Sequence, residues 1–232
     1  MPVKQKFKIA VLWITLFSIA MGYLESAVVV YLRELYYPSG FDFPMVTLKG
    51  HIAITEIIRE AATMIMLFTV ACIAAESNLK RFAWFLYCFA IWDIFYYLFL
   101  KILIDWPSSL LTWDILFLIP VVWTGPVIAP LIVSFTMILL SGTILFTDIK
   151  PVPFKAYMLI LSGAFIVFLS FILDFSAYLL QQYSFAGLFK FRLHQMILEQ
   201  YVPIRFNWWL FIAGEILILT GITLPLLNRK NQ

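Results

Sequence analysis

Six long apolar runs, separated by short stretches rich in charged or turn-forming residues, dominate the pattern of the chain. A helix needs roughly 20 apolar residues to cross a bilayer, and each run is at least about that long. The runs do not alternate between apolar and polar positions, as the strands of a membrane barrel would. The pattern therefore predicts an all-α, polytopic membrane helical bundle that forms one integral membrane domain over residues 1–232. The predicted spans lie at about 9–36, 51–75, 82–104, 110–147, 155–181 and 206–227.

The fourth run is too long for one straight crossing, and turn-forming residues interrupt it. Pro120, Pro126 and Pro130 each lack the amide N–H that an inner helical position donates, and Gly125 weakens a helix further. We therefore expect a short outer helix at 110–121, followed by a full span that starts near residue 127. This interpretation gives about six transmembrane helices.

Composition supports the membrane assignment and identifies the lipid bilayer as a partner. The chain is 63% hydrophobic and 12% charged, with a mean hydropathy of +0.97, whereas a soluble domain has roughly 25% charged residues. The net charge of +3 gives no support for nucleic acid binding. The basic residues stand mostly at the ends of the apolar runs, where they set topology.

The basic residues predict that both termini are cytoplasmic. They gather before the first run and in the connections and tail that share its side of the membrane, which is typical of a cytoplasmic face. The residues concerned are Lys4, Lys6, Lys8, Lys80, Arg81, Lys150, Lys155, Arg229 and Lys230. We expect the protein to reside in the plasma, or inner, membrane. The first run continues to about Tyr37, which favours a retained anchor over a cleaved signal.

Two segments on the predicted outer side carry apolar side chains outside the spans. Residues 37–45 combine Pro, Gly and Asp with aromatic residues, which is typical of a plain turn but also suits a lid. Residues 184–201 place apolar side chains at helical spacing and charges on other faces. This spacing predicts an amphipathic helix in the outer interface. Such a helix could anchor the protein or gate the entry of a ligand from the lipid.

Seven carboxylates stand in or beside the apolar runs, with one arginine, Arg59, placed deep among them. A charge at the centre of a membrane helix costs roughly 2.5 to 3.5 kcal/mol, so these side chains predict a functional site. At 1.5 Å of rise per residue, all seven fall in the outer half of the bundle or near its midplane. They are Glu25, Glu56, Glu60, Asp93, Asp114, Asp174 and Glu215.

Helical spacing ranks these side chains. Glu56, Arg59, Glu60 and Thr63 share one face of the second span, where Arg59 can pair with one of the flanking glutamates. Glu25 shares a face of the first span with small residues, which favour close packing between membrane helices. The residues expected to form a catalytic core are Glu25, Glu56, Arg59, Glu60 and Asp93.

A second group is expected to surround this core and bind a substrate. Trp92 and Tyr96 lie beside Asp93 near the midplane, where an interfacial aromatic belt and the lining of a pocket are equal alternatives. Asp174 and Glu215 are expected in the walls of the site. Asp114 is expected at a shallower position, on the short outer helix.

Protons, Arg59 or a bound cation must balance so many acids. A divalent metal ion is one alternative, because carboxylate and imidazole side chains are its usual ligands. The candidate ligands are Glu25, Glu56, Glu60 and His51. Against a metal, the chain lacks the Glu-x-x-His pairs of di-iron bundles, and His51 lies on a different face from Glu56. The sequence identifies no other cofactor.

Three functions fit these features. The preferred hypothesis is a membrane-embedded enzyme that uses its carboxylates as acid, base or metal ligands on a lipid-like or quinone-like substrate. The second is a proton- or cation-coupled transporter of a small molecule, since broken helices often accompany transport sites. The third is an accessory subunit of a membrane complex, whose buried ionic network is structural.

Overall fold

The protein is a bundle of long helices interrupted by one small β-hairpin. The computed structural model describes residues 3–46, 48–147, 152–185, 187 and 196–230. Within these ranges six helices are long and apolar enough to cross a membrane, which confirms the predicted fold class. The elements are α1 (Val3–Tyr36), α2 (Gly50–Ala74), α3 (Asn78–Ile104), β1 (Trp113–Phe117), β2 (Trp123–Pro126), α4 (Ile128–Phe146), α5 (Phe154–Gln182) and α7 (Trp208–Lys230).

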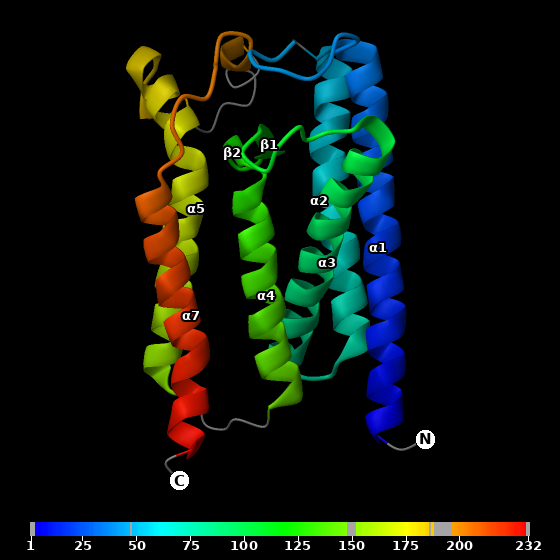
Figure 1. The fold of residues 1–232 in the computed structure, drawn as a ribbon, viewed down its shortest axis with the longest axis vertical. Coiled ribbons are helices and arrows are strands. Elements are labelled where there is room, and N and C mark those ends of the chain that lie inside the picture. Colours follow the sequence, from blue (N-terminus) through cyan, green and yellow to red (C-terminus); the bar gives the residue numbers. More distant parts are fainter. Residues whose placement is uncertain (1–2, 47, 148–151, 186, 188–195, 231–232) are drawn as a thin grey trace.

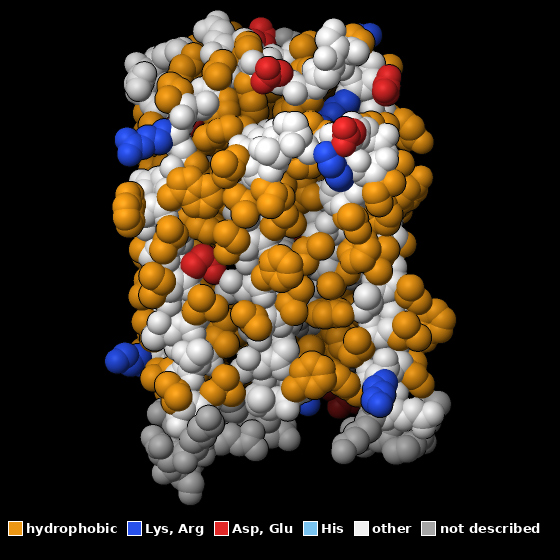
Figure 2. Space-filling view, in the orientation of Figure 1, with side chains coloured by type: hydrophobic (Ala, Val, Ile, Leu, Met, Phe, Trp, Pro, Cys, Tyr) orange, Lys and Arg blue, Asp and Glu red, His pale blue; other side chains and the backbone are white. Residues whose placement is uncertain are grey.

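The helices form two groups joined through α4. Figure 1 shows α1, α2 and α3 together on one side, α5 and α7 paired on the other, and α4 between them, with the β-hairpin above α4. The two ends of the chain lie at the same end of the bundle. On the face seen in Figure 2, hydrophobic side chains cover the middle of the molecule, and Lys and Arg side chains lie toward its two ends. This distribution suits a protein surrounded by lipid.

The β-hairpin occupies the place of the short outer helix expected at 110–121, so that prediction was wrong. Strands β1 and β2 pair antiparallel, with Asp114 opposite Gly125. The aromatic and branched residues of β1 favour extended backbone, and Pro120 cannot donate in a helical ladder. Non-helical backbone is tolerated inside a membrane bundle where protein covers it. Asp114 and Thr124 are buried, so the bundle does cover the hairpin.

Much of the amphipathic helix predicted at 184–201 lies outside the described residues. Residues 196–198 are helical. Ile197 and Leu198 are buried in one hydrophobic cluster with Phe175 and Leu179 of α5. These two side chains therefore face the protein interior.

Glycines bring α5 and α7 into direct backbone contact. A Cβ atom at Gly163 would lie 2.6 Å from the carbonyl oxygen of Gly214, and one at Gly214 would lie 2.8 Å from that of Gly163. Gly221 meets the backbone of Ala156 in the same way, at 2.9 Å. Small residues at such positions let membrane helices approach closely. Helices α5 and α7 therefore form a tight pair.

Gly163→Ala is expected to lower the free energy of unfolding by about 1 to 3 kcal/mol. The new methyl group overlaps backbone atoms, which cannot move aside by rotation as a side chain can. Gly142→Ala in α4 is the matched control, since the nearest atom to its Cβ is 3.9 Å away. Alanine also favours a helix over glycine, so the control should be neutral or slightly stabilising. Unfolding of both variants in detergent measures the difference. Equal stability of the two would contradict the close approach at Gly163.

Candidate functional site

A cavity of about 660 Å³ lies among α1 to α4, the β-hairpin and the first loop after α1. Most of its lining is apolar, and Tyr37, Phe41 and Met45 of that loop contribute to it. Five carboxylates and two guanidinium groups also line it. These are Glu25, Arg33, Glu56, Arg59, Glu60, Asp93 and Asp114. The whole predicted catalytic core therefore faces one cavity.

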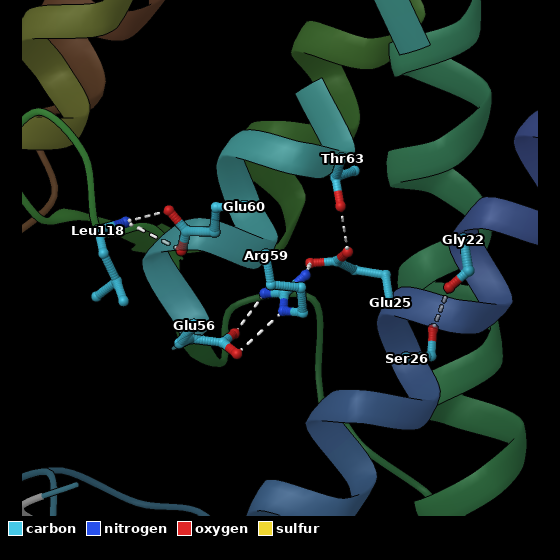
Figure 3. A network of polar contacts seen from close by, with 8 residues as sticks. All are labelled: Gly22, Glu25, Ser26, Glu56, Arg59, Glu60, Thr63 and Leu118. Atoms are coloured by element: carbon cyan, nitrogen blue, oxygen red, sulfur yellow. Dashed lines mark hydrogen bonds and ion pairs between the residues drawn. The ribbon is translucent and has the colours of Figure 1, made fainter. Parts of the chain in front are cut away.

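Arg59 of α2 binds two carboxylates, Glu56 of the same helix and Glu25 of α1, and the second joins the two helices (Figure 3). Its Nε donates to Glu56 Oε2 at 3.0 Å and its Nη2 to the other oxygen of Glu56, while Nη1 binds Glu25. Thr63 Oγ1 donates to the second oxygen of Glu25 at 3.3 Å. The predicted pairing of Arg59 with one flanking glutamate is confirmed for Glu56, and Glu25 is a further partner. Bidentate bonding of this kind fixes the geometry of a guanidinium strongly.

Glu60 turns away from Arg59 and binds the loop between the strands (Figure 3). Both of its carboxyl oxygens lie 3.2 Å from the backbone nitrogen of Leu118, which donates to them. The side chain is buried and, within the described residues, has no cation in an ion pair. Glu60 therefore positions the hairpin while keeping a carboxyl group at the cavity wall.

Asp93 links α3 to α4 in a similar way. Its Oδ2 accepts a hydrogen bond of 2.8 Å from the hydroxyl of Ser134, and the side chain is buried. No cation pairs with it among the described residues. A carboxyl group can hold several hydrogen bonds, so Asp93 retains capacity for a further donor.

Asp114 belongs to a second ionic cluster, and it lies on β1 and not on the expected outer helix. Only 3% of the residue is exposed. Its Oδ1 lies 3.7 Å from Arg33 Nη2, and the hydroxyl of Tyr97 donates to its Oδ2 at 3.2 Å. Burial raises the pKa of the Asp114 carboxyl to about 6, although Arg33 and Tyr97 act in the opposite direction.

Arg33 is a second buried arginine, and the predicted site did not include it. Its guanidinium carbon lies 3.7 Å from the ring centre of Trp106 and 4.5 Å from that of Phe41. Contacts with aromatic faces of this kind stabilise a cation that has left water. Helical spacing could have indicated this position, because Glu25, Val29 and Arg33 follow each other at four-residue intervals and share one face of α1. All three line the cavity.

The predicted substrate-binding residues separate into two sets. Trp92 and Tyr96 line the cavity with their rings nearly parallel, at a centroid distance of 6.4 Å. Asp174 and Glu215 are not in its lining, so the structure does not bring them to this site. Asp174 accepts from the hydroxyl of Tyr201 at 2.6 Å and from two backbone N–H groups of the segment before α7. Glu215 of α7 accepts from Thr136 of α4 at 2.6 Å.

The candidate metal ligands do not assemble. In the part of the chain that the structure describes, no three His, Cys, Asp or Glu side chains form a group that could hold a metal ion. His51 is exposed at the start of α2. Arg59 binds Glu25 and Glu56, and Glu60 binds the hairpin backbone. The metal interpretation stays a prediction, and we base no proposal on it.

The fold and the site define a polytopic membrane protein with buried charged residues around an apolar-walled cavity. No family model matches the chain, and no curated protein or solved structure matches it. Inferences about function therefore start from the cavity and its side chains.

Proposed function

We propose that the protein is a membrane-embedded enzyme that acts on an amphipathic, lipid-like or quinone-like substrate by proton transfer. Glu60 and Asp93 are the proposed acid and base. The observation that carries this proposal is the contrast among the carboxylates of the cavity. Glu25 and Glu56 both pair with Arg59, whereas Glu60 and Asp93 each bind only uncharged donors among the described residues. A carboxyl without a paired cation can take up and release a proton during a reaction.

The shape of the cavity supports an amphipathic substrate. Small-molecule sites commonly enclose about 300 to 1,000 Å³ and combine apolar walls with a few polar groups, and this cavity of about 660 Å³ has both features. At the polar end of the cavity, hydrogen bonds hold Arg59 and Glu56 of α2 and Glu25 of α1 in a fixed arrangement. The distribution of basic residues supports placing this end in the extracytoplasmic half of the membrane.

Glu60→Gln and Asp93→Asn are expected to reduce turnover at least about a hundredfold, because each removes a group that exchanges a proton. Both amides retain an oxygen that can accept from Leu118 or Ser134, so folding should survive. The native protein and variants, in nanodiscs with membrane lipid and quinone extracts, can be compared by mass spectrometry of the products. Glu34→Gln, at an exposed carboxylate outside the cavity, is the control. Full turnover in both cavity variants would refute the assignment.

A coupled transporter is the second candidate, and the β-hairpin is the observation that favours it. Non-helical backbone within a membrane bundle often accompanies a substrate or ion site, and the hairpin contributes Asp114 to the cavity. Uptake of a solute into proteoliposomes, driven by a proton gradient and lost in Asp93→Asn, would favour transport. Chemical conversion of a substrate without any gradient would favour the enzyme.

A further inference from the structure

Connected aromatic rings form one wall of the cavity beside Asp93. Phe89 and Trp92 of α3 lie 5.1 Å apart between ring centres, and Phe117 of the hairpin stacks on Phe89 at 6.0 Å and 24°. Trp92 continues to Tyr96, whose ring is inclined to it by only 23°. All four side chains line the cavity. Two of these three contacts join nearly parallel rings, whereas Phe89 and Trp92 meet at 64°. Aromatic surfaces of this kind favour a ligand that is itself flat and aromatic or quinonoid.

Two hydrogen-bond donors on cavity-lining residues lack an acceptor. The indole N–H of Trp92 and the Nη1 group of Arg33 are buried and have no hydrogen-bond partner within the described residues. Trp92 is 5% exposed and Arg33 is 8% exposed. Buried donors are almost always bonded in native proteins, so each orphan calls for an explanation. An acceptor oxygen on a bound molecule would supply one.

The charges of the cavity exclude one large class of lipid. Five carboxylates line it against two guanidinium groups, and both guanidinium groups already pair with carboxylates. A phosphate or fatty-acid head would meet like charges in poorly solvated surroundings. The ligand head should therefore be uncharged. The head should also carry acceptor atoms for the two unbonded donors, on Trp92 and Arg33. It should in addition carry hydroxyl groups that can donate to Glu60 and Asp93.

We propose that the cavity binds a quinone-class lipid, with its ring against the aromatic wall and a ring oxygen accepting from the Trp92 indole N–H. In the reduced form of the ligand, a ring hydroxyl donates to Asp93, the residue next to Trp92. The tail lies along the apolar lining of the cavity. This assignment rests on the proposed function and names the substrate class of the same site.

The test is a binding titration of the full-length protein in nanodiscs, using a benzoquinone with a ten-carbon tail and its reduced form. Trp92→Phe keeps an aromatic ring but removes the N–H, and it should weaken quinone binding about tenfold. Trp209→Phe is the matched control, because Trp209 is 82% exposed on α7 and is absent from the cavity lining. It should bind like the native protein. Asp93→Asn should weaken binding of the reduced form more than that of the oxidised form.

The outcomes separate this inference from the enzyme proposal. Native affinity in Trp92→Phe, or equal binding of an unbranched alcohol with the same tail, would overturn the quinone assignment. If Trp92→Phe fails to fold, the test is how much Asp93→Asn weakens binding of each redox form. An equal loss of affinity for the oxidised and the reduced form would overturn the quinone assignment. If the protein converts a lipid without a ring and this turnover depends on Asp93, the quinone assignment is refuted but the enzyme proposal is not. If neither the quinones nor ring-free lipids bind in the cavity, both the quinone assignment and the enzyme proposal are refuted.

Discussion

Arg59→Met is expected to lower the free energy of unfolding by about 3 to 5 kcal/mol, the usual cost of removing one partner from a buried ionic group. Arg59 is the cation that both Glu25 and Glu56 bind. Without it, two carboxylates from different helices would face each other across an apolar cavity. Methionine has a similar length and no charge, so the variant removes the guanidinium without leaving a large void. Denaturant unfolding in mixed micelles would measure the loss.

Two further variants give this prediction its internal controls. Arg205→Met removes an exposed arginine in the segment before α7 and should leave stability almost unchanged. Combining Arg59→Met with Glu25→Gln and Glu56→Gln removes all three charges, and it should recover much of the lost stability. A triple variant as unstable as Arg59→Met alone would show that packing of the arginine side chain, and not charge, holds α1 against α2.

The spans could be predicted from the sequence because insertion into lipid depends on the length and polarity of each segment by itself. The predicted start of the fourth span near residue 127 agrees with α4, which begins at Ile128. The hairpin before it could not be recognised in the same way. Its strands are short, and they pair residues on both sides of a turn, such as Trp113 and Pro126. Apolar composition does not distinguish such strands from a short buried helix.

Part of the cavity lining could be predicted for a related reason. Spacing along one helix shows which side chains share a face, and this was enough to group Glu56, Arg59 and Glu60. It does not show which helices become neighbours. Glu215 was therefore expected at the site, but α7 packs against α5 and α4 and places this carboxyl beside Thr136. Arg33 was missed because a basic residue at the end of a span usually marks the membrane surface.

Arg33→Met should destabilise the protein by about 3 kcal/mol at pH 8, and by less at acidic pH. Arg33 pairs with the buried Asp114 carboxyl, whose folded-state pKa is about 6, against an ordinary value of 3.8. Because the folded form holds this proton more tightly than the unfolded form does, ionisation of Asp114 opposes folding as the pH rises. Arg33 limits that cost, since it lowers the pKa. Without Arg33 the pKa of Asp114 should lie higher still.

The difference in unfolding free energy between the native protein and Arg33→Met should therefore widen as the pH rises from 5 to 8. At pH 5 Asp114 is mostly protonated in both folded proteins, so the loss of the cation matters least there. Lys101→Met removes the exposed pair with Asp105, and it should show no such trend. In a protein that already carries Asp114→Asn, adding Arg33→Met should change the unfolding free energy by the same amount at every pH, because Asp114 is absent from both proteins and the other groups cancel. A pH-dependent difference that persists without the Asp114 carboxyl would show that another titrating group faces Arg33.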